Sequence, residues 1–323
     1  MRADVRTFLP GAAGVAGVAG AASAMLLVGT LAGVSAVIKD YPIYGGQALR
    51  YGAAALILLT VASASRRPST RLTLRDVLLL VAQAAVGLVL FNVCVIEATR
   101  HASPAMVGTV IGCVPVALAV AGPVLIGTAD GRRRPSARVV AAGCVVVAGA
   151  ALTTGLGTGS PRGLLLAAGA LACEMAFSLL AMPLLPRLGP IRVSAYAAAA
   201  AAPMALLIGA TVDGRAVLRV PTTAELAALS YLAIVISAAF LLWYSALTRL
   251  GPDRAGLFAG VVPIGAILTT VALGIGRPTA VDLAATMLVI VGILVGMSRG
   301  RRTAMPALAL ATTRPAYSAA RPT

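Results

Sequence analysis

The sequence predicts an all-α integral membrane protein with about ten transmembrane helices, arranged as two inverted five-helix repeats. Three observations lead to this fold class: the composition, the length of the apolar segments, and a motif that occurs twice. Hydrophobic residues make up 59% of the 323-residue chain and charged residues only 11%. At this ratio there is too little polar surface to cover a soluble globule, so lipid must be the solvent.

Apolar segments long enough to cross a bilayer, about 20 residues each, follow one another along the chain. They predict helices at 16–38, 44–64, 77–98, 103–127, 138–157, 163–185, 192–211, 226–248, 253–275 and 279–298. The uncharged stretch over 7–38 is too long for the apolar part of a signal peptide, so we interpret it as the first membrane helix. Residues 299–323 are rich in Ala, Thr, Pro and Arg, which predicts a disordered cytoplasmic tail.

The repeated motif lies in FNVCVIEATRHASPAMVGTVIGCVP, residues 91–115, and in FLLWYSALTRLGPDRAGLFAGVVP, residues 240–263. Matched positions are separated by 149 residues before the turn and by 148 after it. The matched residues are Phe91, Thr99, Arg100, Gly108, Gly112 and Pro115 in the first copy, and Phe240, Thr248, Arg249, Gly256, Gly260 and Pro263 in the second. Two copies in two halves indicate an internally duplicated transporter. Because each half has five helices, the halves enter the membrane in opposite senses; we expect repeats at 1–157 and 158–298.

The distribution of positive residues predicts the orientation. With a cytoplasmic N-terminus, 19 of the 26 lysines and arginines fall on the cytoplasmic side and seven on the other. This excess follows the positive-inside rule, so both termini of this multi-pass protein should face the cytoplasm. We expect the cytoplasmic membrane of a prokaryote.

The same pattern excludes other classes of protein. The net charge of +16 comes from arginines that punctuate apolar runs, which argues against nucleic-acid binding. The four cysteines lie in apolar runs without metal-type spacing, and the one histidine, His101, has no obvious acidic partner except Glu97. We therefore expect no metal, no cofactor and no catalytic triad, and hence no enzyme. There is no P-loop, so the chain is not an ATP-driven pump on its own.

Three segments resemble the EamA-type transporters of the drug/metabolite transporter superfamily. They are the segment LLVGTLAGVSAVIKDYPIYGGQALRYGAAALILL at 26–59 and the two repeated motifs, with an arginine opening the second helix and a proline midway through the fourth. The resemblance implies a secondary carrier, such as an exporter of amino acids, other metabolites or drugs. The family often has tryptophan where this chain has Val28 before Gly29, and again where it has Cys173, so the family's substrates do not carry over.

Two acidic residues inside the predicted spans are candidates for proton coupling. Glu174 lies at the centre of the sixth span, where hydrocarbon surroundings favour the neutral carboxylic acid. A protonated Glu174 bonded to a neighbouring hydroxyl in a purely structural role is the alternative. Glu97 lies near the outer end of the third span, three residues before Arg100, a spacing that suits an ion pair at the interface.

The candidates for lining a substrate cavity are Arg50, Asn92, Trp243 and Tyr244. Arg50 could attract an anionic substrate group or extend to the lipid headgroups. Asn92 shares a helix with Gln83 and Glu97, but on a regular helix it shares a stripe with neither. Trp243 and Tyr244 could form an aromatic wall or part of an interfacial belt.

The glycines and prolines of the motif predict helix packing and kinks. The pairs Gly108/Gly112 and Gly256/Gly260 each put two missing side chains on one helix face, which lets helices approach closely. Pro115 and Pro263 each remove a backbone hydrogen bond and should kink their helices near the membrane centre. We expect these kinked helices to support rocking of the halves around a central site.

Together these observations predict a secondary transporter that exports a small metabolite, amino acid or drug-like solute in exchange for protons. Its expected partners are this solute, protons and membrane lipids. The alternatives are an uncoupled facilitator and the membrane subunit of a multi-protein complex. The sequence fixes neither the substrate nor the oligomeric state.

Overall fold

A computed structural model of the chain describes residues 12–38, 40–64, 71–126, 136–154, 159–272 and 279–297. Within these ranges the chain forms helices joined by turns, with one isolated bridge between Ala102 and Gly159. The prediction of an all-α protein is therefore confirmed. Six helices among the described residues are long and apolar enough to cross a membrane, and shorter apolar helices accompany them.

Helices lie in all five predicted spans of the first half. The elements are α1 (Ala12–Ser35), η2 (Ala36–Ile38), α2 (Ile43–Ala64), α3 (Leu74–Ala82), η3 (Gln83–Leu90), α4 (Phe91–His101), α5 (Pro104–Ile111), α6 (Val114–Ile126) and α7 (Ala137–Thr154). Three of them, α3, η3 and α4, form one continuous rod, in which η3 is a π-helix.

Helices also lie in all five predicted spans of the second half. Its elements are α8 (Pro161–Ala181), α9 (Leu185–Val212), η4 (Gly214–Leu218), α10 (Thr223–Leu250), α11 (Pro252–Gly256), η5 (Leu257–Val261), α12 (Val262–Ala272) and α13 (Ala280–Met297). The helix α9 was predicted at 192–211 but begins earlier, at Leu185, and changes direction at Gly189, whose φ of 74° is accessible mainly to glycine.

The fourth and ninth predicted spans are interrupted rather than continuous. The fourth divides into α5 and α6 at Gly112 and Cys113, and the ninth into α11, η5 and α12. Each final helix begins one residue before its proline, Pro115 or Pro263. Proline is tolerated in the first turn of a helix but breaks the hydrogen-bond ladder inside one, which explains the position of both interruptions.

Serine caps begin two helices of the bundle. Ser103 accepts a hydrogen bond from the backbone N–H of Met106, and Ser160 accepts one from Gly163. Each serine is followed by a proline at the first position of the helix, in α5 and in α8. This is the preferred arrangement for a helix start, because the proline lacks a backbone N–H and its φ already fits the helix.

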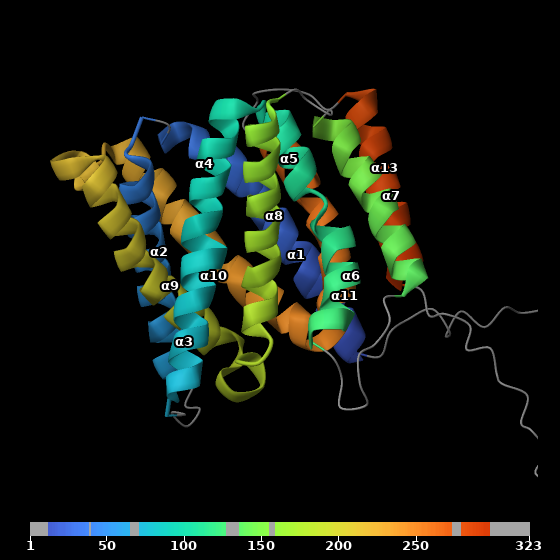
Figure 1. Cartoon of the computed structure of the whole chain (residues 1–323), viewed down its shortest axis with the longest axis horizontal. Coiled ribbons are helices and arrows are strands. Elements are labelled where there is room, and N and C mark those ends of the chain that lie inside the picture. Colours follow the sequence, from blue (N-terminus) through green and yellow to red (C-terminus); the bar gives the residue numbers. More distant parts are fainter. Residues whose placement is uncertain are drawn as a thin grey trace, which may run out of the picture.

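The helices form one bundle (Figure 1). In this view α2 and α9 lie together at one edge, α7 and α13 lie together at the other, and α8 and α10 stand between them. Inside the bundle α1 packs against α10 and α12, while α8 packs against η3, α4 and α5. Contacts between the predicted halves are therefore extensive.

The helix α10 is the centre of the bundle. Of its apolar window 56% is buried, against 28–33% for the other five long helices. Large apolar side chains elsewhere are turned outward, including Leu56, Leu165, Leu207 and Met287, each more than 60% exposed. A surface of this kind suits a lipid environment, in which exposed leucine costs nothing.

Several predictions concern residues outside the described ranges. The tail at 299–323 and the boundary between the predicted repeats at 157/158 both lie there.

Candidate solute-binding site

Polar side chains inside the bundle gather in two clusters, which both involve the rod formed by α3, η3 and α4. The first cluster joins this rod to α2. Gln47 donates from Nε2 to Asn92 Oδ1 over 3.0 Å, and Asn92 donates from Nδ2 to the Tyr51 hydroxyl over 3.2 Å. Arg50 donates from Nη2 to the same hydroxyl over 3.0 Å. Its guanidinium carbon lies 4.8 Å from the centre of the Tyr51 ring, within cation–π range.

The second cluster joins the rod to α8 and α10. The fully buried Gln83 donates from Nε2 to the Tyr244 hydroxyl and to the Phe177 carbonyl oxygen. Trp243 donates from Nε1 to Ser178 Oγ over 3.1 Å. The rings of Phe177, Phe240 and Tyr244 pack together with centroids 5.3–6.3 Å apart.

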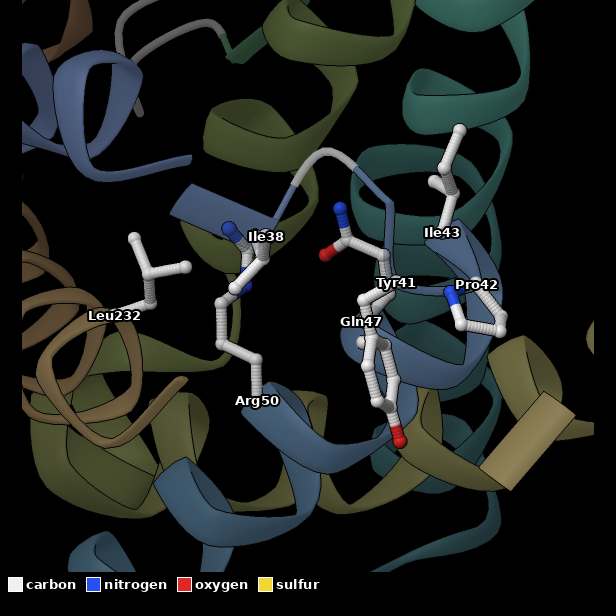
Figure 2. A pocket seen from close by; sticks show the side chains of 8 residues that line it. Ile38, Tyr41, Pro42, Ile43, Gln47, Arg50 and Leu232 are labelled. Atoms are coloured by element: carbon white, nitrogen blue, oxygen red, sulfur yellow. The ribbon is translucent and has the colours of Figure 1, made fainter. Parts of the chain in front are cut away.

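A cavity of about 230 Å³ adjoins the first cluster, at the N-terminal end of α2. Figure 2 shows the Arg50 and Gln47 side chains in its wall, with Tyr41 beside them and Leu232 of α10 on another side. The remaining lining residues are Ile38, Pro42, Ile43 and Gly46. Residues of both predicted halves therefore line this cavity.

Two of the residues that line this cavity each have a buried polar atom without a hydrogen-bond partner, Arg50 Nε and Gln47 Oε1, and neither atom is accessible from the cavity. The three ion pairs of the described residues do not include Arg50. The structure thus places the Arg50 side chain in the cavity wall and against Tyr51.

A second hollow, of about 630 Å³, lies between α1, α10 and α12. Its lining is apolar apart from Thr30, Tyr231 and Thr269. The Tyr231 hydroxyl donates to Thr30, and the Thr269 hydroxyl donates to the Gly265 carbonyl oxygen. Neither hydroxyl can therefore donate to a solute without breaking an existing hydrogen bond. It offers no charged group, and the cavity at Arg50 is the stronger candidate for a polar solute.

The two acidic candidates have different surroundings. Glu97 forms an ion pair with Arg100 over 2.7 Å, and its side chain is 32% exposed. Glu174 is half-buried in α8. No ion pair of the described residues involves Glu174.

The π-helix η3 changes which residues of the rod share a face. On a regular α-helix Gln83 and Asn92, nine residues apart, point in opposite directions. The i→i+5 bonds of η3 widen the helix and turn each residue by less than 100°. As a result Gln83 bonds to α10 and Asn92 bonds to α2, two helices that pack against each other.

The other cavity candidates, Trp243 and Tyr244, are 5% and 0% exposed. They belong to the core of α10, and burial to this extent does not fit an interfacial belt. Neither residue lines the cavity at Arg50.

The two glycines of the second motif copy lie at close helix contacts. A Cβ on Gly256 would lie 3.0 Å from Leu118 in α6, and one on Gly260 would collide with Val146 in α7. Gly108 and Gly112 lie in the fourth segment, with Gly112 at the end of α5. Gly112 thus lies at the interruption of the fourth segment, and Gly256 is the last residue of α11 before that of the ninth.

Sequence reasoning missed two ion pairs that anchor the starts of α3 and α10. Thr73 and Asp76 form a capping box at the start of α3, and Arg187 donates to both Asp76 oxygens over 2.9 and 2.7 Å. Thr222 and Glu225 form the equivalent box at the start of α10, where Glu225 bonds to Arg219. The pattern Thr-x-x-acid and the spacing of 149 residues were both available as signals.

The second pair also ties the halves together. Arg219 donates to the Asp40 carbonyl oxygen, and the Tyr41 hydroxyl donates to the Arg219 carbonyl oxygen over 2.7 Å. The hydrogen bond to Glu225 raises the pKa of the Arg219 guanidinium above its usual value. The other ion pair also links the two halves, because Arg187 of α9 donates to Asp76 of α3.

The described residues contain no group of three or more His, Cys, Asp or Glu side chains that could hold a metal ion. The four cysteines are free.

Comparison with known proteins agrees with this architecture. Residues 161–297 match the EamA-like transporter family, so the resemblance seen in the motifs is confirmed and this part of the chain is an EamA-like domain. Over 255 residues the chain is 25% identical to a protein of Bacillus subtilis (strain 168) described as "Uncharacterized transporter YetK", with 76% of each chain covered. The chain is thus similar to a protein described as a transporter.

A solved structure supports the fold. It is described as "Crystal structure of protein" and superposes with a TM-score of 0.72 at 21% identity, covering 89% of this chain and 96% of that one. At this identity the likeness shows the fold alone.

Proposed function

We propose that the chain is a secondary transporter that moves a small organic solute across the cytoplasmic membrane of a prokaryote by alternating access of two inverted halves. The observation that carries the proposal is a cavity with an unpaired arginine, lined by helices of both halves, inside a bundle of EamA-like fold. Membrane carriers place their solute sites between repeats in this way.

The packing of the helices supports two repeats at 1–157 and 158–298. Each helix of one half has a counterpart in the other, and contacts between helices recur between their counterparts. The contact of α1 with α10 corresponds to the contact of α8 with the rod formed by α3, η3 and α4. The contact of α1 with α12 becomes that of α8 with α6, and the pairs α2/α9 and α7/α13 each map onto themselves. The family match at 161–297 coincides with the second of these units.

Particular residues follow the same exchange. A Cβ on Gly17 would lie 2.9 Å from Leu250, and one on Gly163 would lie 2.7 Å from Ala102. Gly163 follows Gly17 by 146 residues and Leu250 follows Ala102 by 148, close to the spacing of the motif. The start of the first helix in each half therefore meets the end of the third helix in the other.

The helices α7 and α13 carry a second matched contact. Gly149 of α7 abuts Val289 of α13, and Gly292 of α13 abuts Val146 of α7. Gly292 follows Gly149 by 143 residues, and Val289 follows Val146 by the same number. From the first contact to the second, the position moves back by three residues on α7 and forward by three on α13, as in an antiparallel pair. An inverted repeat requires this antiparallel arrangement, because equivalent helices then cross the membrane in opposite senses.

The orientation follows from the arginines. With both termini in the cytoplasm, the Asp76–Arg187 pair lies at the cytoplasmic face and the Glu225–Arg219 pair at the outer face. The cavity at Arg50 then lies toward the outer side of the bundle.

For the coupling ion we propose a proton on Glu174. A carboxylate inside a membrane span costs several kcal/mol unless it is paired or protonated, and Glu174 forms no ion pair with a described residue. Glu97 already has Arg100 as its partner, so we assign it to the interface. Export of the solute against proton entry is the direction that we propose; an uncoupled facilitator or a subunit of a larger complex are the alternatives.

Proton movement in inside-out vesicles tests the coupling. A panel of small solutes is added to vesicles with the wild-type protein, Glu174→Gln or Glu97→Gln, each at equal amounts of folded protein. Solute-triggered proton movement in the wild type and in Glu97→Gln, but not in Glu174→Gln, is the expected result. Undiminished movement in Glu174→Gln would contradict the assignment. Solute flux that does not depend on protons in any variant would favour the facilitator.

A further inference from the structure

We propose that two groups of contacts between the halves, one at each face of the bundle, are the gates that open in turn during transport. The inner gate is the ion pair of Arg187 with Asp76, and the outer gate is the set of contacts of Arg219 with Asp40 and Tyr41. This inference rests on the proposed function, because it names the contacts that control access to the site from each side.

The inner gate joins α9 to α3. Arg187 donates from Nη1 to both carboxylate oxygens of Asp76, over 2.9 and 2.7 Å. The Arg187 side chain is 44% exposed, so water can solvate its charge once the pair separates. Asp76 then still accepts hydrogen bonds from the backbone N–H and the hydroxyl of Thr73. The pair can therefore open without leaving a buried carboxylate unsatisfied.

The outer gate joins the segment before α10 to the segment between α1 and α2. Arg219 donates from Nη2 to the Asp40 carbonyl oxygen over 3.3 Å, and its own carbonyl oxygen accepts from the Tyr41 hydroxyl over 2.7 Å. The guanidinium carbon lies 4.7 Å from the centre of the Tyr41 ring, within cation–π range. Glu225 binds the same guanidinium from within the second half and accepts from the backbone N–H of Thr222. Arg219 and Glu225 therefore remain paired when the outer gate opens.

The two gates occupy equivalent positions in the proposed repeats. Glu225 follows Asp76 by 149 residues, and Arg187 follows Tyr41 by 146, close to the spacing of the motif. Each gate thus connects the junction of the first and second helices in one half to the start of the third helix in the other. Because the halves are inverted, equivalent contacts lie at opposite faces and exchange conformations when the site changes side. Each gate should therefore open while the other is closed.

The outer gate also forms part of the wall of the cavity at Arg50 (Figure 2). Residues 38–43 supply four of the side chains that line this cavity: Ile38, Tyr41, Pro42 and Ile43. Arg219 holds this segment against the start of α10. Leu232, one of the other lining residues, is only 1% exposed. Release of residues 38–43 from Arg219 should therefore make position 232 more accessible from outside.

The reactivity of a cysteine in the cavity tests both gates. Leu232→Cys is introduced into the full-length chain with its four native cysteines replaced by alanine, and the rate of labelling by a membrane-impermeant maleimide is measured on intact cells. Arg219→Gln should favour the state that is open to the outside and speed labelling by about threefold to tenfold, since the contacts involve a charged but partly exposed group. Arg187→Gln should favour the state that is open to the cytoplasm and slow labelling.

Two further variants complete the experiment. Arg162→Gln removes the same charge from an exposed position in the first turn of α8, and should leave the labelling rate unchanged. If Arg219→Gln does not fold, Tyr41→Phe replaces it, because it removes one hydrogen bond of the outer gate and keeps the ring. It should speed labelling in the same direction, but less.

The outcomes are distinct. Equal labelling rates in Arg219→Gln and Arg162→Gln would overturn the outer gate, and faster labelling in both Arg219→Gln and Arg187→Gln would overturn the alternation. In either case, solute-triggered proton movement by the wild type in vesicles would leave the proposed function intact. Opposite changes in labelling, together with no proton movement for any solute, would support the gates and contradict proton coupling.

Discussion

At the residue scale, the close contact between α1 and α12 depends on two glycines. A Cβ on Gly29 of α1 would collide with the Val262 carbonyl oxygen, and one on Gly265 of α12 would collide with the Leu26 carbonyl oxygen. Backbone cannot move aside as a flexible side chain can, so each position requires glycine. The repeated motif indicates the glycines of the fourth and ninth segments, but the importance of Gly29 and Gly265 depends on which helices pack together, which the sequence does not show.

Gly29→Ala should destabilise the protein by about 1–3 kcal/mol, the usual cost of overpacking. Gly52→Ala is the matched control, because a Cβ there would lie 3.9 Å from Ala202, an ordinary contact. Thermal unfolding in detergent measures both. Equal melting temperatures for the two variants would show that α1 and α12 are not this close.

The buried hydrogen bond between Gln83 and Tyr244 allows a second prediction at this scale. Tyr244→Phe leaves the Gln83 amide without one of its two acceptors, and should cost about 1–3 kcal/mol of stability. Gln83→Leu in the Tyr244→Phe background should recover part of that loss, since no buried polar group then remains unpaired at this contact. Additive losses in a double-mutant cycle would contradict the hydrogen bond.

At the element scale, hydrophobic patterning predicted where helices occur but not how they are interrupted. Every predicted span contains helix, because about 20 apolar residues in lipid have no better way to pair their backbone groups. The prolines of the motif explain the interruptions before Pro115 and Pro263. The π-helix at Gln83–Leu90 was not predictable, because it depends on a tertiary contact: a Cβ on Gly87 would lie 2.6 Å from Phe177 Cβ.

The candidate site could be predicted only in part, because it too depends on tertiary contacts. The sequence identified Arg50 and Asn92 as polar residues inside spans, but Gln47 became a candidate only when the packing of α2 against the rod placed it beside Asn92. The location of Arg50 in a cavity wall rather than at the lipid surface is a property of the folded bundle. Trp243 and Tyr244 stood out by residue type, yet the structure places them in the core.

The capping box at the start of α3 allows a prediction about stability. Asp76 both completes the box with Thr73 and receives Arg187, whereas Arg187 takes part only in the ion pair that connects α9 to α3. Asp76→Ala should therefore lower the melting temperature more than Arg187→Gln. Equal losses in the two variants would mean that the link between helices, and not the cap, is the main contribution.

At the scale of the whole molecule, the halves are packed across each other rather than side by side. The helix α1 lies on α10, and α8 lies on the rod of the first half, so neither half can bury its first helix alone. Residues 1–157 and 158–323 expressed together as two chains should assemble and co-purify, and each expressed alone should be degraded. A stable isolated half would contradict this interdigitated arrangement.

The central claim is that equivalent segments of the two halves face opposite sides of the membrane. It is tested most directly with single cysteines placed before the two capping boxes, Leu72→Cys and Val220→Cys, in a chain whose four native cysteines are replaced by alanine. Both positions are exposed, at 40% and 88%. With a membrane-impermeant maleimide on intact cells and on inside-out vesicles, we expect Cys at position 72 to react only from the cytoplasm and Cys at position 220 only from outside. Reaction of both from the same side would contradict the inverted repeat, and with it the proposed mechanism.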